Sequence, residues 1–222
     1  MKTIAIICML IDHIGLLFFP DVWQLRAIGR LAMPIFAYSL ARGSLYTSSI
    51  KRYMKKLFIF ACLSQLPFWG MLYLAGELDF SWMHFNIGFT FLIALICINI
   101  LEKMKNSKPI ERFMSMGMLF IIMMLSEVFG CDYGIYGILL VLGFYGVLRT
   151  QQSLALLPII YTLVTWLNYS LVPSSFWLQE MGVLACAIII GLRSVSERRI
   201  GKLFYCFYPL HMILLCLIKL WF

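Results

Sequence analysis

Two of the three histidines in this sequence lie deep inside apolar segments, where titratable groups are rare. His13 follows Asp12 in the first apolar run, and His211 lies in the last one. A helical rise of about 1.5 Å per residue puts His13 roughly 14 Å above Ile4 and His211 roughly 12 Å above Leu203. The two imidazoles therefore fall at similar depths on the first and last helices.

Ionisable groups at such depth usually face a bundle interior, a partner or a water-filled cavity. Asp12 and His13 are adjacent, hence about 100° apart on a helix, so each needs a partner from another helix. A single such histidine is adequately explained as a hydrogen-bonded core residue. Two at matched depth, together with Asp12, favour a functional role over a purely structural one.

A second set of polar residues is expected at the outer ends of the helices. Arg26 and Arg30 are four apart and share a helical face near the start of the second apolar run. They can hold a carboxylate or phosphate by forked hydrogen bonds, or merely neutralise nearby acidic residues. His84 is either an interfacial residue among aromatic anchors or a substrate contact at a cavity mouth. The predicted substrate-binding residues are Arg26, Arg30, His84, Asn86, Glu127 and Asp132.

Composition identifies the elements that must position these residues. The 222-residue chain is 63% hydrophobic and 13% charged, whereas soluble domains average about 45–50% apolar and 25% charged residues. It is therefore expected to be an all-α, polytopic transmembrane helical bundle forming a single domain, residues 1–222. A spanning helix needs about 20 apolar residues. The about nine predicted spans are Ile4–Phe19, Leu31–Tyr46, Leu57–Gly76, Ile87–Leu101, Phe113–Gly130, Gly134–Leu148, Leu154–Val172, Trp177–Leu192 and Leu203–Phe222.

The distribution of Lys and Arg predicts the orientation, because cytoplasmic loops retain these residues. With the amino terminus inside and the carboxyl terminus outside, only Arg26, Arg30 and Lys219 of the 18 Lys and Arg residues fall on the outer side. Topology thus explains the net charge of +8, and no nucleic-acid partner is required. A basic inner face can also attract anionic membrane lipid or a nucleotide-bearing cosubstrate.

The seven cysteines indicate neither a disulfide framework nor a metal site. They are scattered without any Cys-x-x-Cys pair, and all but Cys131 lie in apolar runs, where cysteine behaves as a small hydrophobic residue. We predict no bound metal.

Five ordered segments give the chain a family resemblance. They are "LIDHIG", "RAIGRLAMPIFAYSLARG", "NIGFTFLIAL", "DYGIYGILLVLGFY" and "LFYCFYPLHMILL". Together they resemble the TraX family of bacterial membrane enzymes, which acetylate the amino terminus of pilin. The resemblance implies acetyl transfer from cytosolic acetyl-CoA to an acceptor at the outer face of the cytoplasmic membrane, such as a pilin-like peptide or a saccharide. The matching segments contain Asp12, His13, Arg26, Arg30, Asn86, Asp132 and His211.

Acetyl transfer to an amine needs a general base, and neutral histidine suits that task, so we predict His13, Asp12 and His211 as the catalytic residues. His13 would be the general base or a transient acetyl carrier, with Asp12 as a structural or electrostatic partner. His211 would polarise the thioester carbonyl or relay the proton. Arg26 and Arg30 would bind an acceptor carboxylate or stabilise the oxyanion.

Two other classes of protein remain open on the sequence alone. Midplane histidines and carboxylates also build the proton relays of transporters and proton-coupled carriers. A noncatalytic assembly partner is the third possibility. Acetyl-CoA-dependent product formation would separate the enzyme from both.

Overall fold

The computed structural model describes residues 1–78, 83–171, 179–192 and 201–221, and these residues form an all-helical protein. Within them the only strand-like pairing is an isolated parallel bridge between Phe85 and Cys131. The helices are α1 (Lys2–Phe18), α2 (Trp23–Gly29), α3 (Ala32–Tyr46), α4 (Ile50–Ala75), α5 (Ile87–Met104), α6 (Pro109–Val128), α7 (Gly134–Arg149), α8 (Leu156–Leu171), the 3-10 turn η1 (Met181–Val183), α10 (Leu184–Gly191) and α11 (Gly201–Trp221).

Three helices of the described ranges are long and apolar enough to cross a membrane, namely α4, α5 and α6. The apolar helices α7 and α10 and the described part of α11 are shorter. The structure therefore supports a helical membrane protein, whereas nine spans and their orientation stay predictions.

One expected boundary was wrong, and one helix was not expected. The second predicted span, Leu31–Tyr46, agrees with α3 to within one residue, but a separate short helix, α2, precedes it and carries Arg26. α4 begins at Ile50, seven residues before the expected Leu57. Its first turns are rich in Lys and Arg, which favour helix as well as apolar residues do, so hydropathy alone places the helix start too late. Trp177, the expected start of the eighth span, lies outside the described residues.

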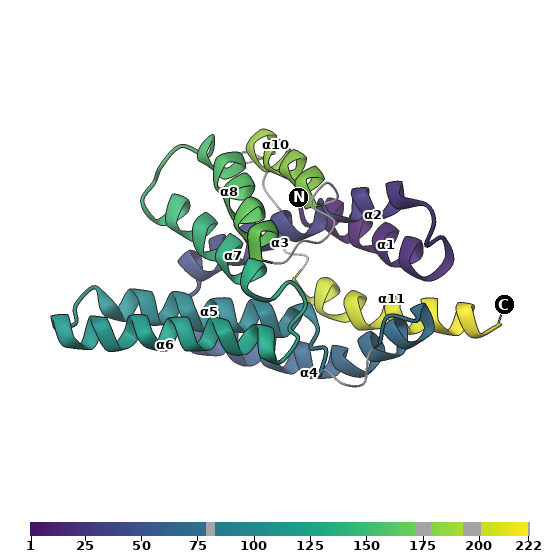
Figure 1. The fold of residues 1–222 in the computed structure, drawn as a ribbon, viewed down its shortest axis with the longest axis horizontal. Coiled ribbons are helices and arrows are strands. Elements are labelled where there is room, and N and C mark those ends of the chain that lie inside the picture. Colours follow the sequence, from purple (N-terminus) through teal and green to yellow (C-terminus); the bar gives the residue numbers. More distant parts are fainter. Residues whose placement is uncertain (79–82, 172–178, 193–200, 222) are drawn as a thin grey trace.

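Figure 1 shows α4, α5, α6 and α11 along one side of the molecule, with the remaining helices on the other. α4 packs between α5 and α11, while α3 packs against α1, α5 and α7. α2 folds back onto α1. α6 lies at the edge of the first group and buries only Leu119 and Ser126, so its apolar surface faces outward. The core is built mainly by α1, α3, α4, α5 and α7, and α8, α10 and α11 add buried residues to it.

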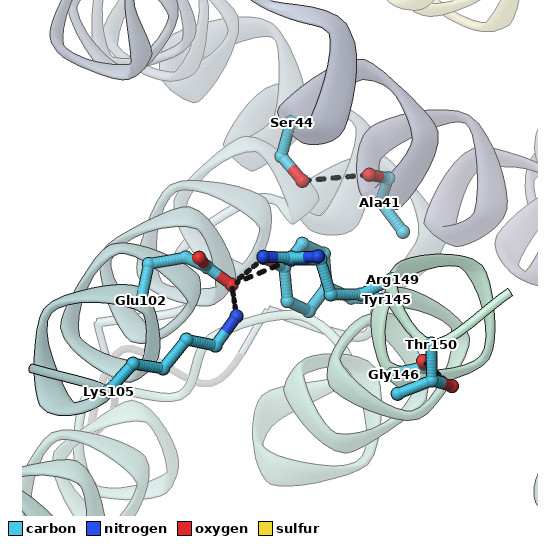
Figure 2. A network of polar contacts seen from close by, with 8 residues as sticks. All are labelled: Ala41, Ser44, Glu102, Lys105, Tyr145, Gly146, Arg149 and Thr150. Atoms are coloured by element: carbon cyan, nitrogen blue, oxygen red, sulfur yellow. Dashed lines mark hydrogen bonds and ion pairs between the residues drawn. The ribbon is translucent and has the colours of Figure 1, made fainter.

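A polar network joins the end of α5 to the end of α7 (Figure 2). One carboxylate oxygen of Glu102 accepts hydrogen bonds from Lys105 and from the Tyr145 hydroxyl. Arg149 Nε of α7 lies 3.4 Å from the same oxygen. The network links the ends of α5 and α7, two helices that contribute to the core.

Candidate active site

The histidines of the first and last helices are in direct contact. His13 Nδ1 of α1 lies 2.7 Å from His211 Nε2 of α11, and the two ring planes differ by only 5°. His211 Nδ1 lies 2.8 Å from the backbone oxygen of Phe207, one turn earlier in α11. Both imidazoles are buried. The matched depths expected from the sequence therefore correspond to a hydrogen-bonded pair.

These contacts determine which nitrogens carry protons. A carbonyl oxygen only accepts, so His211 Nδ1 donates to Phe207 and, in the neutral ring, His211 Nε2 accepts. His13 Nδ1 must then donate to His211. The lone pair of neutral His13 is thereby left on Nε2, the nitrogen that this chain of hydrogen bonds does not use. The arrangement sets His13 as a proton acceptor oriented by a second imidazole.

The hydrogen-bond partner of Asp12 lies on another helix, α2, as we expected from the position of Asp12 on α1. Arg26 Nη1 donates to Asp12 Oδ2 over 2.9 Å, and both side chains are largely buried. Asp12 packs directly against Gly29, where a Cβ atom would come within 2.1 Å of Asp12 Oδ1. That oxygen is buried and has no hydrogen-bond partner among the described residues. Asp12 thus links α1 to α2 through Oδ2, while Oδ1 remains an acceptor without a partner among the described residues.

Arg30, at the end of α2, reaches the turn before α7. Its Nη1 donates to the Tyr133 hydroxyl over 3.0 Å, and its Nε is buried without a partner among the described residues. Tyr133 has a left-handed backbone with φ of 63°, which is uncommon for a bulky residue. Such strain clusters at functional sites. The unused Nε is a spare cationic donor beside this turn.

A cavity of about 130 Å³ brings these groups together. Its lining includes five of the predicted site residues, and His211 supports it from behind through His13. Most of the remaining wall is apolar. The predicted residues in the lining are Asp12, His13, Arg26, Arg30 and Asp132.

Sequence reasoning missed several residues of this wall. Tyr133, Tyr208 and Gly29 line the cavity, and so does Glu77, an exposed residue just after α4. Two features of the sequence could have identified the tyrosines. Tyr133 directly follows Asp132, and Tyr208 lies three residues before His211 on the same helical face.

Three predicted substrate contacts do not line this cavity. The backbone oxygen of His84 accepts hydrogen bonds from Gln65 and Trp69. Glu127 Oε1 accepts from the Ile135 N–H over 2.6 Å and so caps the start of α7. The third is Asn86, which is fully buried. Their substrate-binding roles stay predictions, while their observed contacts serve the fold.

Asn86 holds α4 and α5 together. Its side-chain oxygen accepts from the Gly88 N–H at the start of α5, and its Nδ2 donates to Ala61 O and Gln65 Oε1 over 2.8 Å each. An Asn86→Ala variant is expected to lose about 2–4 kcal/mol of stability, because a helix cap disappears and buried partners are left unpaired. Thermal unfolding in detergent measures this loss. Asn106→Ala, at an exposed position, is the matched control and should unfold at the wild-type temperature.

Metal binding has no obvious location in the described ranges. No group of three or more His, Cys, Asp or Glu side chains there is arranged to hold a metal ion. The cavity chemistry is that of imidazole, guanidinium and carboxylate groups.

Comparison with known proteins identifies a family over almost the whole chain. Residues 1–219 match the family described as TraX protein. A probable fimbrial assembly protein FimC, serogroup H1, from Dichelobacter nodosus is 29% identical over 238 residues, covering 99% of this chain and 94% of the relative. Protein TraX of Escherichia coli is 26% identical over 233 residues, covering 99% and 86% respectively. No solved structure matches the chain at a significant level.

Proposed function

The chain belongs to the TraX family, and from this premise we propose that it is a bacterial membrane acetyltransferase that serves pilus or fimbrial assembly. It takes acetyl groups from cytosolic acetyl-CoA and delivers them to an acceptor at the outer face of the cytoplasmic membrane. The acceptor is a pilin-like amino terminus or a saccharide hydroxyl. The names of the relatives support the pilus connection.

The observation that carries the chemical proposal is the hydrogen-bonded pair of His13 and His211. Acetyl transfer needs a base that removes a proton from the attacking nitrogen or oxygen. His13 Nε2 has the lone pair for this step, and Nδ1 donates to His211 before and after proton transfer. The charge that forms on His13 is therefore stabilised by an existing hydrogen bond. His211 acts on the substrate only through His13.

The proposed step balances as an ordinary acyl transfer. The acceptor atom bonds to the acetyl carbonyl carbon while His13 takes its proton, and the negative charge gathers on the carbonyl oxygen. The bond to sulfur then breaks, and the CoA thiolate leaves and takes the proton. Arg26 and Arg30 supply positive charge beside the cavity, and preorganised charge of this kind stabilises an oxyanion. The cavity of about 130 Å³ has room for roughly four waters at about 30 Å³ each, which suits an acetyl group and the end of an acceptor.

Release of CoA from acetyl-CoA tests the proposal. Purified protein in detergent is given acetyl-CoA with a panel of peptide amines and sugars, and free thiol is followed together with the acetylated product. We expect release that depends on the acceptor. Absence of both product and acetyl-CoA binding across the panel would contradict the enzyme and favour the proton-coupled carrier.

Asp132 makes the charge of this site depend on pH. It lies in the turn between α6 and α7, outside the helices, and removal of its carboxyl from water raises the pKa of Asp132 to about 7. Arg30 and Arg26 lower that pKa, whereas Asp12 raises it. The carboxyl is therefore neutral below about pH 7 and negative above it, where it offsets the two arginines.

Infrared difference spectra measure this titration. A protonated carboxyl band is expected to disappear with a midpoint near pH 7. The band should be missing in Asp132→Asn and retained in Asp21→Asn, because Asp21 is exposed and outside the cavity. A band that persists in Asp132→Asn would assign the proton to another residue.

A further inference from the structure

A second, larger cavity opens among positive side chains at the start of α4. Its volume is about 520 Å³, within the range of about 300–1,000 Å³ found for small-molecule sites. Arg52 and Lys56 of α4 line it together with Lys2 of α1. Hydroxyl groups from residues 47–49, between α3 and α4, complete the wall. Cations and hydroxyls around an open cavity are suited to phosphate groups. We call it the basic cavity.

A narrow cavity of about 90 Å³ lies between the basic cavity and the active-site cavity. It shares Lys2, Tyr53 and Tyr205 with the basic cavity. It shares Phe36 and Phe91 with the active-site cavity. A side chain that lines two cavities borders both of them, so the three cavities follow one another through the bundle.

The order of lining residues along the helices gives the same succession. On α3, Gly43 lines the basic cavity, Leu40 the narrow cavity and Met33 the active-site cavity. On α1, Lys2 lines the first two and His13 the last. His13 lies eleven positions after Lys2, or about 16 Å along the α-helix. The path from the basic cavity to the imidazole therefore runs along the helices.

We propose that the basic cavity binds the phosphorylated nucleotide of acetyl-CoA, with the pantetheine arm directed past the narrow cavity toward His13. This inference rests on the proposed acetyltransferase activity. The arm has the backbone-like bonds of about four extended residues, or roughly 14 Å. With the nucleotide phosphates near Arg52 and Lys56, the arm points along α1 and α3 toward the cavity that His13 lines. Ser39 and Tyr53 in the narrow cavity supply hydroxyl groups for the amides of the arm.

Inorganic phosphate, a lipid headgroup and CoA can each bring a phosphate group to the basic cavity. Of these three, CoA combines the phosphates with a nucleotide and a thioester arm. Adenosine 3′,5′-bisphosphate, which retains the nucleotide alone, should compete with CoA for the basic cavity. Inorganic phosphate at the same concentration should compete far less.

Two double variants on the same helix test the proposal by equilibrium binding of CoA in detergent. Arg52→Ala/Lys56→Ala removes two of the three cations that line the basic cavity. It leaves the cap at the start of α4, because the Ser49 hydroxyl accepts from the Arg52 backbone N–H. Lys51→Ala/Lys55→Ala removes equal charge from exposed neighbours that do not line it. We expect affinity for CoA to fall about tenfold, or 1.4 kcal/mol, in the first variant and to stay unchanged in the second.

A short donor separates this inference from the proposed function. S-acetyl-N-acetylcysteamine has the thioester and no nucleotide, so Arg52→Ala/Lys56→Ala should use it as well as the wild type does. Equal CoA affinity in the two double variants would overturn the basic cavity as the nucleotide site, even if the wild type transfers acetyl groups. Selective loss of CoA binding in a protein that transfers no acetyl group would support the cavity and refute the enzyme.

Discussion

Acetyl transfer by a His13→Ala variant is expected to fall by about 10²–10⁴-fold, the usual contribution of a general base. The variant lacks His13 Nε2, the imidazole nitrogen at the cavity whose lone pair is not used in a hydrogen bond between described residues. Acceptor-dependent release of CoA is the measurement. Binding of CoA should persist, because the basic cavity is unchanged.

The other two histidines serve as matched comparisons. His84→Ala should leave the chemical step at the wild-type rate, since His84 does not line the active-site cavity, and any loss should appear as weaker acceptor binding, the role predicted from the sequence. His211→Ala should show an intermediate loss and an altered pH profile, because His13 keeps its proton-accepting nitrogen and loses its orientation. A folded His13→Ala protein with full activity would exclude His13 as the base.

Gly29→Ala is expected to be the most destabilising single-methyl change at the site. The added Cβ would meet the Asp12 side chain, including its Cβ at 2.3 Å, which cannot swing away because it is attached to the backbone of α1. α1 and α2 must therefore separate, at a cost of about 3 kcal/mol, the upper end for overpacked sites. Thermal unfolding in detergent should show a clear fall in midpoint. Acetyl transfer should fall too, because the Asp12–Arg26 pair lies at this contact.

Gly117→Ala provides the control for helix propensity. Gly117 lies in α6, and an added Cβ there meets nothing within 4 Å. Because alanine favours helix over glycine by about 1 kcal/mol, this variant should unfold at the wild-type temperature or above. An equally stable Gly29→Ala protein would show that α1 and α2 adjust to each other more freely than the structure implies.

The sequence predicted the helical class and the pairing depth of the histidines because both depend on simple periodicities. Apolar runs locate α5 and α7 almost to the residue at their starts. The rise per residue placed His13 and His211 at one level, where they are hydrogen-bonded. The position of a helix, and of a residue along it, can thus be predicted from the local sequence where contacts with other helices do not decide it.

The remaining features depend on contacts between elements. α2 was missed because it is too short to produce an apolar period. Asn86 was predicted to bind substrate, a role that stays a prediction. Its amide joins α4 and α5 in the structure. No local sequence pattern reveals this contact between helices. The strained backbone of Tyr133 likewise depends on its tertiary surroundings, which include Arg30.

The partnership of α1 with α11 has a consequence for the timing of biogenesis. His13 and His211 are separated by 198 positions in the chain. The ribosome must add 198 residues after His13 before the imidazole of α1 can meet its partner. A nascent chain that has inserted every earlier helix still holds His13 without its orienting hydrogen bond. The proposed transfer chemistry is thereby withheld from a nascent chain that lacks α11, because α11 completes the site that α1 begins.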